Sequence, residues 1–152
     1  MNIKILKDIE ISANLGDITI RTDGRSVKIL FNRSLENVKE KEFTREENLL
    51  GLIQFENVFI QKFGYPNDEG LHQHNYYKNG LSFYHGHLVE ESDWIKEWND
   101  KRSVNKITGQ NYLNGYNHYI LTFQENTFEC IAKKYTLRYY NDERQRILKE
   151  IF

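Results

Sequence analysis

Residues 17–31 carry the strongest local structural signal in the chain, an Asp-Gly pair between two alternating segments. Asp23-Gly24 stands where the alternation of apolar and polar residues is interrupted and then resumes. An Asp-Gly pair supplies the positive φ angles of a tight type I′ turn, and a period of two is typical of a half-buried strand. The segment therefore predicts a β-hairpin with one apolar face. The cross-strand pairs expected from this turn are Ile20 with Val27 and Ile18 with Ile29.

Three further segments alternate in the same way and predict strands. The first eleven residues place four isoleucines on one face, namely Ile3, Ile5, Ile9 and Ile11. Residues 49–63 do the same with Ile53, Phe55, Phe59 and Phe63, and residues 81–89 alternate again. Ten Tyr and nine Phe among 152 residues strengthen this interpretation, because aromatic side chains favour strands.

Residues 119–132 predict a second hairpin, with its turn around Glu125-Asn126. In that register Cys130 shares the apolar face with Leu121, whereas His118 points to the opposite face. A cysteine nucleophile needs a base beside its thiolate, so this parity argues against a Cys130–His118 pair. We expect Cys130 to be a small, buried core residue.

Two short helices complete the expected fold. Ser92 is a favourable N-cap with Asp93 in the first turn, and Trp94, Ile95 and Trp98 follow on one side. Residues 141–152 predict the second helix, with an inner side formed by Ile147, Leu148 and Ile151. Thr44 and Glu47 have the spacing of a capping box, and residues 99–116 have the composition of a loop.

These elements predict a mainly β fold in a single domain that spans residues 1–152. About six to eight strands and two short helices are compatible with an antiparallel sandwich or an open, barrel-like sheet. A curved sheet packed against helices, which is an α+β arrangement, is also compatible. Helices follow strands too rarely for a doubly wound parallel sheet.

Charge and cysteine content restrict the partners and the compartment. The 21 basic and 22 acidic residues are interleaved, so we expect no nucleic-acid partner, which would require a basic face. No segment approaches the roughly 18 apolar residues of a membrane helix, and the chain starts without the apolar run of a signal peptide. Cys130 is the only cysteine, which fits a reducing compartment. We expect a cytoplasmic protein without membrane contact and without a cofactor.

The histidines suggest an alternative function, because four of the five fall within sixteen residues. His85 and His87 point to one side of a predicted strand, and Glu91 follows them. This spacing resembles the first half of the metal motif of cupins, and the ligand set suits zinc, iron or nickel. The glycines of that motif are misplaced, and a second half is missing. A metal-dependent, cupin-like enzyme that uses His85, His87 and Glu91 stays the alternative.

Residues 64–80 form a long loop that concentrates chemically versatile side chains, and long loops are often functional. The binding residues that we predict there are Tyr65, Asp68, Glu69, His74 and Tyr76. Trp94 and His118 complete the predicted set; for Trp94 the two interpretations are packing in the core and a surface aromatic anchor, which would suit a binding protein. The alternative is a purely structural turn at Pro66, in which Asp68 and Glu69 satisfy nearby backbone amides.

From about Val58 to Lys134 the chain resembles a group of small, uncharacterised bacterial proteins. The segments that carry the resemblance are Phe63–Glu69, His74, Gly80-Leu81, Ser92-x-Trp94-Ile95, His118–Phe123 and Thr127–Ala132. The resemblance implies a bacterial cytosolic protein and transfers no catalytic residue. Together with the lack of a catalytic motif, it favours a non-enzymatic binding protein with a protein partner. An immunity protein that neutralises a toxin is one form of this, and the oligomeric state stays open.

Overall fold

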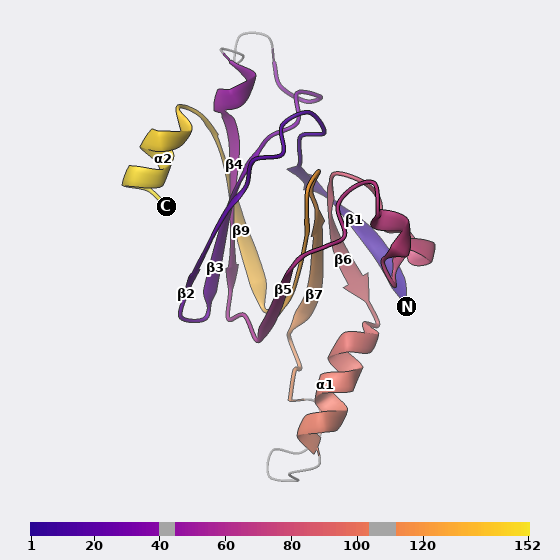
Figure 1. The fold of residues 1–152 in the computed structure, drawn as a ribbon. Coiled ribbons are helices and arrows are strands. Elements are labelled where there is room, and N and C mark those ends of the chain that lie inside the picture. Colours follow the sequence, from indigo (N-terminus) through magenta and orange to yellow (C-terminus); the bar gives the residue numbers. More distant parts are fainter. Residues whose placement is uncertain (40–44, 104–111) are drawn as a thin grey trace.

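The computed structural model describes residues 1–39, 45–103 and 112–152, and there the chain forms two antiparallel β-sheets and two α-helices (Figure 1). The sheets pack face to face, which confirms the mainly β prediction and makes the fold a sandwich. Thr44 of the predicted capping box lies outside the described residues, as do residues 104–111 of the predicted loop 99–116. The loop prediction is wrong for residues 99–103, which are helical.

Each strand in either sheet is antiparallel to its neighbours. The five-stranded sheet has the order β1 (Asn2–Glu10), β6 (His85–Glu90), β7 (Asn117–Thr122), β8 (Thr127–Ala132) and β5 (Ile60–Gly64). The four-stranded sheet has the order β2 (Thr19–Asp23), β3 (Ser26–Asn32), β4 (Leu49–Glu56) and β9 (Lys134–Asn141). The helices are α1 (Asp93–Ser103) and α2 (Arg144–Glu150), with 3₁₀ turns at η2 (Glu46–Asn48), η3 (Leu71–Gln73) and η4 (Tyr77–Asn79).

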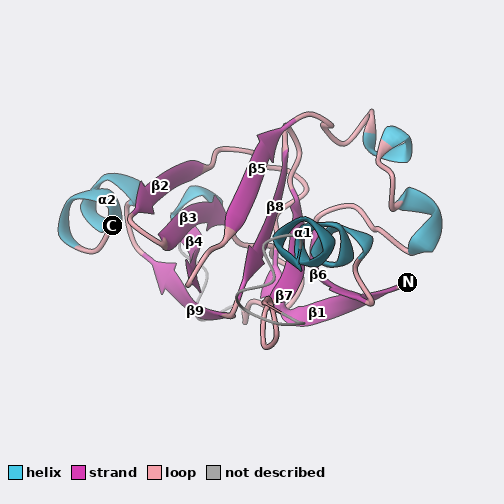
Figure 2. Cartoon of the chain, turned by 90° about the horizontal axis from the view of Figure 1, so that it is seen from below, coloured by secondary structure: helices cyan, strands magenta, loops and turns pink. Residues whose placement is uncertain are grey.

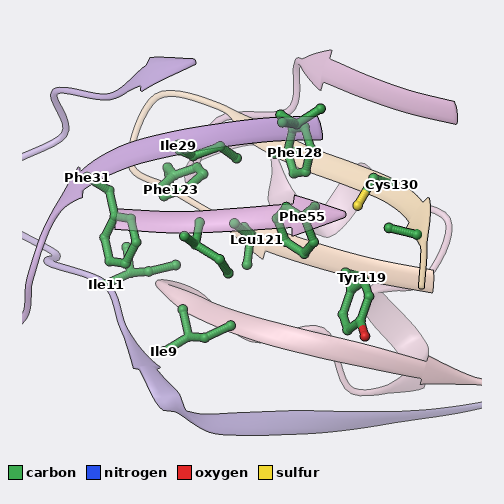
Figure 3. Packing of buried hydrophobic residues seen from close by; sticks show 13 residues of the cluster. Ile9, Ile11, Ile29, Phe31, Phe55, Tyr119, Leu121, Phe123, Phe128 and Cys130 are labelled. Atoms are coloured by element: carbon green, nitrogen blue, oxygen red, sulfur yellow. The ribbon is translucent and has the colours of Figure 1, made fainter. Parts of the chain in front are cut away.

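The main hydrophobic core lies between the two sheets (Figure 3). Phe55 of β4 is at its centre, with ring centroids 5.2 Å from Tyr119 and 5.5 Å from Phe128. Cys130 is fully buried in the same core. In the pairing of β7 with β8, Leu121 lies opposite Phe128, two residues from the register of a turn centred on Glu125-Asn126, so the predicted face of Cys130 and Leu121 is preserved. The second hairpin and the burial of Cys130 are therefore confirmed.

Each sheet also has a covered outer face, and the two α-helices lie on opposite sides of the molecule (Figures 1 and 2). On the four-stranded sheet, α2 places Ile147 against Leu30 and Leu50. The outer face of the five-stranded sheet has two covers. One is the segment that contains η3 and η4, which packs Leu71 and Leu81 onto the sheet, and the other is α1.

The first hairpin forms as predicted, but its register is different. Asp23 pairs with Ser26, so that Gly24 and Arg25 are the central turn residues, and Gly24 has a φ of 62°. Glycine at the first central position is typical of a type II′ turn rather than the type I′ turn that we expected. Ile20 consequently lies opposite Ile29, not Val27. The register shift is two residues, so the apolar face is preserved.

The prediction of one continuous isoleucine face on β1 is wrong, because the pairing of β1 with β6 is interrupted between Leu6 and Glu10. Ile9 and Ile11 lie in the core between the sheets, while Ile3 packs on the outer face. Ile5 is 36% exposed. The irregular pairing thus reverses the side of the sheet on which the later residues of the strand lie.

Residues 49–63 are two strands rather than one. The chain leaves the four-stranded sheet after Glu56 and enters the other sheet at Ile60, and Asn57 between them has a φ of 54°. Ile53 and Phe55 are core residues, but Phe63 is on an exposed edge. The predicted inner position of Ile151 is also wrong, since this side chain is 41% exposed beyond the end of α2.

Candidate functional site

A buried polar network lies beneath the two covers of the five-stranded sheet. The carboxylate of Glu129 on β8 accepts hydrogen bonds from His118 Nε2 at 3.0 Å and from His74 Nε2 at 3.1 Å. The other ring nitrogen of His118, Nδ1, lies 2.8 Å from Ser92 Oγ. We call His74, Ser92, His118 and Glu129 the histidine network. Three of its four members are less than 9% exposed, namely Ser92, His118 and Glu129.

Backbone amides determine the direction of each hydrogen bond in the network. The amide of Tyr76 donates to His74 Nδ1 at 3.1 Å, so the ring proton of His74 is on Nε2 and points to Glu129. Ser92 Oγ accepts the Ile95 amide at 3.2 Å, which leaves its hydroxyl proton for His118 Nδ1. The imidazole of His118 then also donates through Nε2. Every polar atom in the chain of bonds has a partner, as a buried network requires.

Glu129 holds the single negative charge of the histidine network. Burial on its own would raise the pKa of this carboxyl group. The hydrogen bonds from His118 and His74 outweigh the burial and lower the pKa to about 2. Glu129 is therefore ionised at neutral pH, and its two oxygens hold two rings that arrive from distant parts of the chain.

The positions of these side chains follow from strand register and helix capping. Ile120 and Lys62 are the cross-strand partners of Glu129 on β7 and β5, so all three side chains project from the outer face. Ser92 is the N-cap of α1, which confirms the predicted helix start. The cap thus brings the first turn of α1 against the histidine network.

Two aromatic rings rest on the network and form the walls of an open groove. Trp94 and Tyr76 both pack edge-on against the ring of His118, with centroids 5.1 Å and 5.5 Å away. The space outside them measures about 590 Å³. We call it the aromatic groove, and its lining residues are Met1, Lys62, Asn75, Tyr76, Asn79, Asp93, Trp94 and Glu97. Its lining residues come mainly from the η3–η4 segment and from the first two turns of α1.

Four of the predicted binding residues come together at the histidine network and the aromatic groove. His74 and His118 belong to the histidine network, and Tyr76 and Trp94 form the groove walls. The sequence placed them in a loop, a helix and a strand up to 44 residues apart, and only the fold makes them neighbours.

The other three predicted binding residues lie elsewhere. The Tyr65 side chain is 70% exposed, and its hydroxyl donates to Gln73 at 2.8 Å. Asp68 accepts a hydrogen bond from the Tyr84 hydroxyl at 2.7 Å, which raises the pKa of Tyr84 to about 12. Asp68 also accepts the backbone amide of the exposed Glu69 at 2.8 Å. The bond from the Glu69 amide to Asp68 is of the kind that the structural alternative for this turn requires.

The structure does not assemble the alternative metal site. His87 is fully buried, and its Nδ1 donates to the Ile120 carbonyl at 3.1 Å while its Nε2 accepts the Ser82 amide at 3.0 Å. Both nitrogens are thus committed to the backbone, and burial lowers the pKa of His87 to about 4. Glu91 has a side chain that is 77% exposed. Across residues 1–39, 45–103 and 112–152, no three His, Cys, Asp or Glu side chains are arranged to hold a metal ion.

Sequence reasoning did not identify Glu129, Ser92 and Lys62 as parts of one site. A signal for Glu129 was present, because it is the one charged residue in the otherwise apolar run from Phe128 to Ala132. A carboxylate in a strand that is buried on both faces needs hydrogen-bonding partners. The two histidines were the available donors, but the strand pattern does not say which of them reach it.

Comparisons with protein-family models, with curated proteins and with solved structures found no match to this chain. Neither helix in the described part of the chain has the length and apolar content to cross a membrane.

Proposed function

We propose that this is a non-enzymatic binding protein that receives a segment of a protein partner in the aromatic groove. The observation that carries the proposal is the fixation of Tyr76 and Trp94 against His118, which is itself held by Glu129 and Ser92. Aromatic side chains dominate binding energy at protein interfaces. Rings that are already immobile lose little conformational entropy when a partner arrives.

The composition of the histidine network supports a positioning role. Burial of the Glu129 charge opposes folding and is offset only by its hydrogen bonds from two histidines. An apolar residue at this position would avoid that cost. What the carboxylate adds is a fixed orientation for His118, and through it for both groove walls.

The cellular setting is part of the proposal. The resemblance to small bacterial proteins and the single reduced cysteine favour a bacterial, cytoplasmic protein. An immunity protein that blocks a toxin is a specific form of such a binding protein, and this form rests on analogy of class. A toxin gene beside the gene for this chain supports it, and a metabolic operon argues against it.

Groove-filling variants test the proposal. Asn79 is exposed at the rim, so Asn79→Trp fills the aromatic groove without disturbing the core. Asn37→Trp is the matched control, since Asn37 lines a separate hollow beside β1. We expect a partner captured from the host lysate to be lost with Asn79→Trp and retained with Asn37→Trp. Retention with Asn79→Trp, or loss with Asn37→Trp alone, contradicts the proposed site.

A hydrolase is the second candidate, because Ser92, His118 and Glu129 are the residue types of a serine catalytic triad and are hydrogen-bonded in that order. It ranks second because Ser92 is only 4% exposed and its Oγ already accepts the Ile95 amide. A fluorophosphonate probe separates the two functions. Stoichiometric labelling that disappears with Ser92→Ala favours the hydrolase, and no labelling favours the binding protein.

A further inference from the structure

Lys62 already occupies the aromatic groove with a positive charge. Its Nζ lies 4.3 Å from the centroid of the Trp94 ring, within the range of a cation–π contact. The side chain extends from β5, at the edge of the sheet, and among the described residues it is the only Lys or Arg side chain that lines the groove. The chain's own ammonium group therefore shows which chemistry this aromatic face accepts.

The wall formed by α1 supplies negative charge beside that ring. Asp93 and Glu97 both line the groove, and their side chains are 68% and 57% exposed. Each is paired with a lysine of its own helix, Asp93 with Lys96 at 3.8 Å and Glu97 with Lys101 at 2.9 Å. Exposed pairs of this kind contribute little energy, so the carboxylates are free to exchange partners.

The electrostatic environment of Tyr76 agrees with this charge distribution. Burial raises the pKa of the Tyr76 hydroxyl, and the negative charges of Glu129, Asp93 and Glu97 raise it further. The amino group of Met1, which also borders the groove, lies 3.7 Å from Glu91. If the Lys62 side chain swings out, two carboxylates and two aromatic rings remain around the vacated position.

We infer that the aromatic groove recognises a lysine or arginine side chain of the partner, and that Lys62 occupies the position of this side chain until the partner displaces it. The inference rests on the proposed function and specifies the chemistry of the partner. A basic side chain gains the Trp94 face and the two carboxylates together, whereas an acidic one meets repulsion from Asp93 and Glu97.

The test uses the full chain and short peptides with acetylated and amidated ends that carry lysine, arginine or glutamate. The indole N–H signals of Trp94 and Trp98 are followed by NMR. We expect the lysine and arginine peptides to shift the Trp94 signal and the glutamate peptide to leave it unchanged. With Lys62→Met, which keeps the apolar stem, affinity should rise on the order of tenfold, because a competing cation–π contact is removed.

Lys133→Met is the matched control, since Lys133 lies over Tyr116 at 5.5 Å and does not line the groove. It should bind the lysine peptide with wild-type affinity. Equal affinities of Lys62→Met and wild type overturn the inference, and so does equal binding of the glutamate peptide.

A double variant separates failure of this inference from failure of the proposed function. Asp93→Asn combined with Glu97→Gln removes the negative charge and keeps the size of both side chains. Loss of the captured partner with this variant supports basic recognition. If the partner is retained here but lost with Asn79→Trp, the proposed function stands and the inference about charge is wrong.

Discussion

His87 is a histidine that the fold keeps neutral, because its ring is fully buried and both ring nitrogens are hydrogen-bonded to the backbone. Burial lowers its pKa to about 4 from an ordinary value of 6.5. Between these values the unfolded chain binds a proton that the folded chain excludes, so stability falls as the pH drops. The full contribution, present above pH 6.5, is about 3 kcal/mol, of which about 2 kcal/mol is lost between pH 7 and pH 5.

Chemical denaturation at pH 7 and pH 5 measures this loss. We expect His87→Gln, which keeps a donor and an acceptor but does not titrate, to be less stable than wild type at pH 7 and to lose less on acidification. Glu129 does not interfere, because its pKa of about 2 limits its own effect to pH values below about 4.5. Equal losses in the two proteins would show that His87 is not the titrating group.

Cys130 provides a second prediction at the scale of single residues. Its thiol is fully buried between the sheets, and burial raises its pKa well above the ordinary value. Reaction with a thiol reagent should therefore be slow in native buffer and fast in denaturant. Rapid labelling of the native protein would contradict both the burial and the register of β7 with β8.

At the scale of elements, Ser92 has two functions at the start of α1. Its Oγ accepts the Ile95 amide and donates to His118. We expect Ser92→Ala to cost about 2 kcal/mol in the free energy of unfolding, from the lost cap and the unpaired imidazole. Ser12→Ala is the control, because the buried Ser12 accepts two backbone amides but has no histidine partner. Equal costs for the two variants would show that the bond to His118 adds nothing.

The close packing of β4 against β3 predicts a loss of stability when a side chain is enlarged. Gly51 lies opposite Phe31, and a Cβ atom added there would come closer than 3.0 Å to the Phe31 ring. Gly51→Ala should therefore destabilise the protein by about 1–3 kcal/mol through overpacking. Phe31→Leu in the same chain should reduce the penalty of the alanine, and a thermodynamic cycle of the four proteins measures this coupling. Strict additivity would exclude a clash with Phe31.

The elements that were predictable from the sequence are those whose determinants are local. The turns near Gly24 and Asn126, the cap at Ser92 and the face of Cys130 each depend on a few neighbouring residues. The change of sheet at Asn57 and the irregular pairing of β1 depend instead on how the two sheets pack against each other. The alternation of apolar and polar residues in the sequence carries no information about that packing.

The candidate site was only partly predictable for the same reason. Aromatic content and the cluster of histidines drew attention to His74, Tyr76, Trp94 and His118. The carboxylate that joins them is 55 residues from His74 in sequence. Its role appears only once β8 and the η3–η4 segment lie side by side, so the hydrogen bonds had to be read from the structure.

At the scale of the whole molecule, the strand order determines when the chain can fold during synthesis. In the described residues β1 pairs with β6, β4 with β9 and β5 with β8, so three strands from the first half depend on partners from the second half. A growing polypeptide emerges from the ribosome in chain order. Long-range pairing of this kind is slow and cannot begin until the later strands exist. The nascent chain therefore carries unpaired strand edges on β1, β4 and β5, which are open to association with other chains, until its second half has been made.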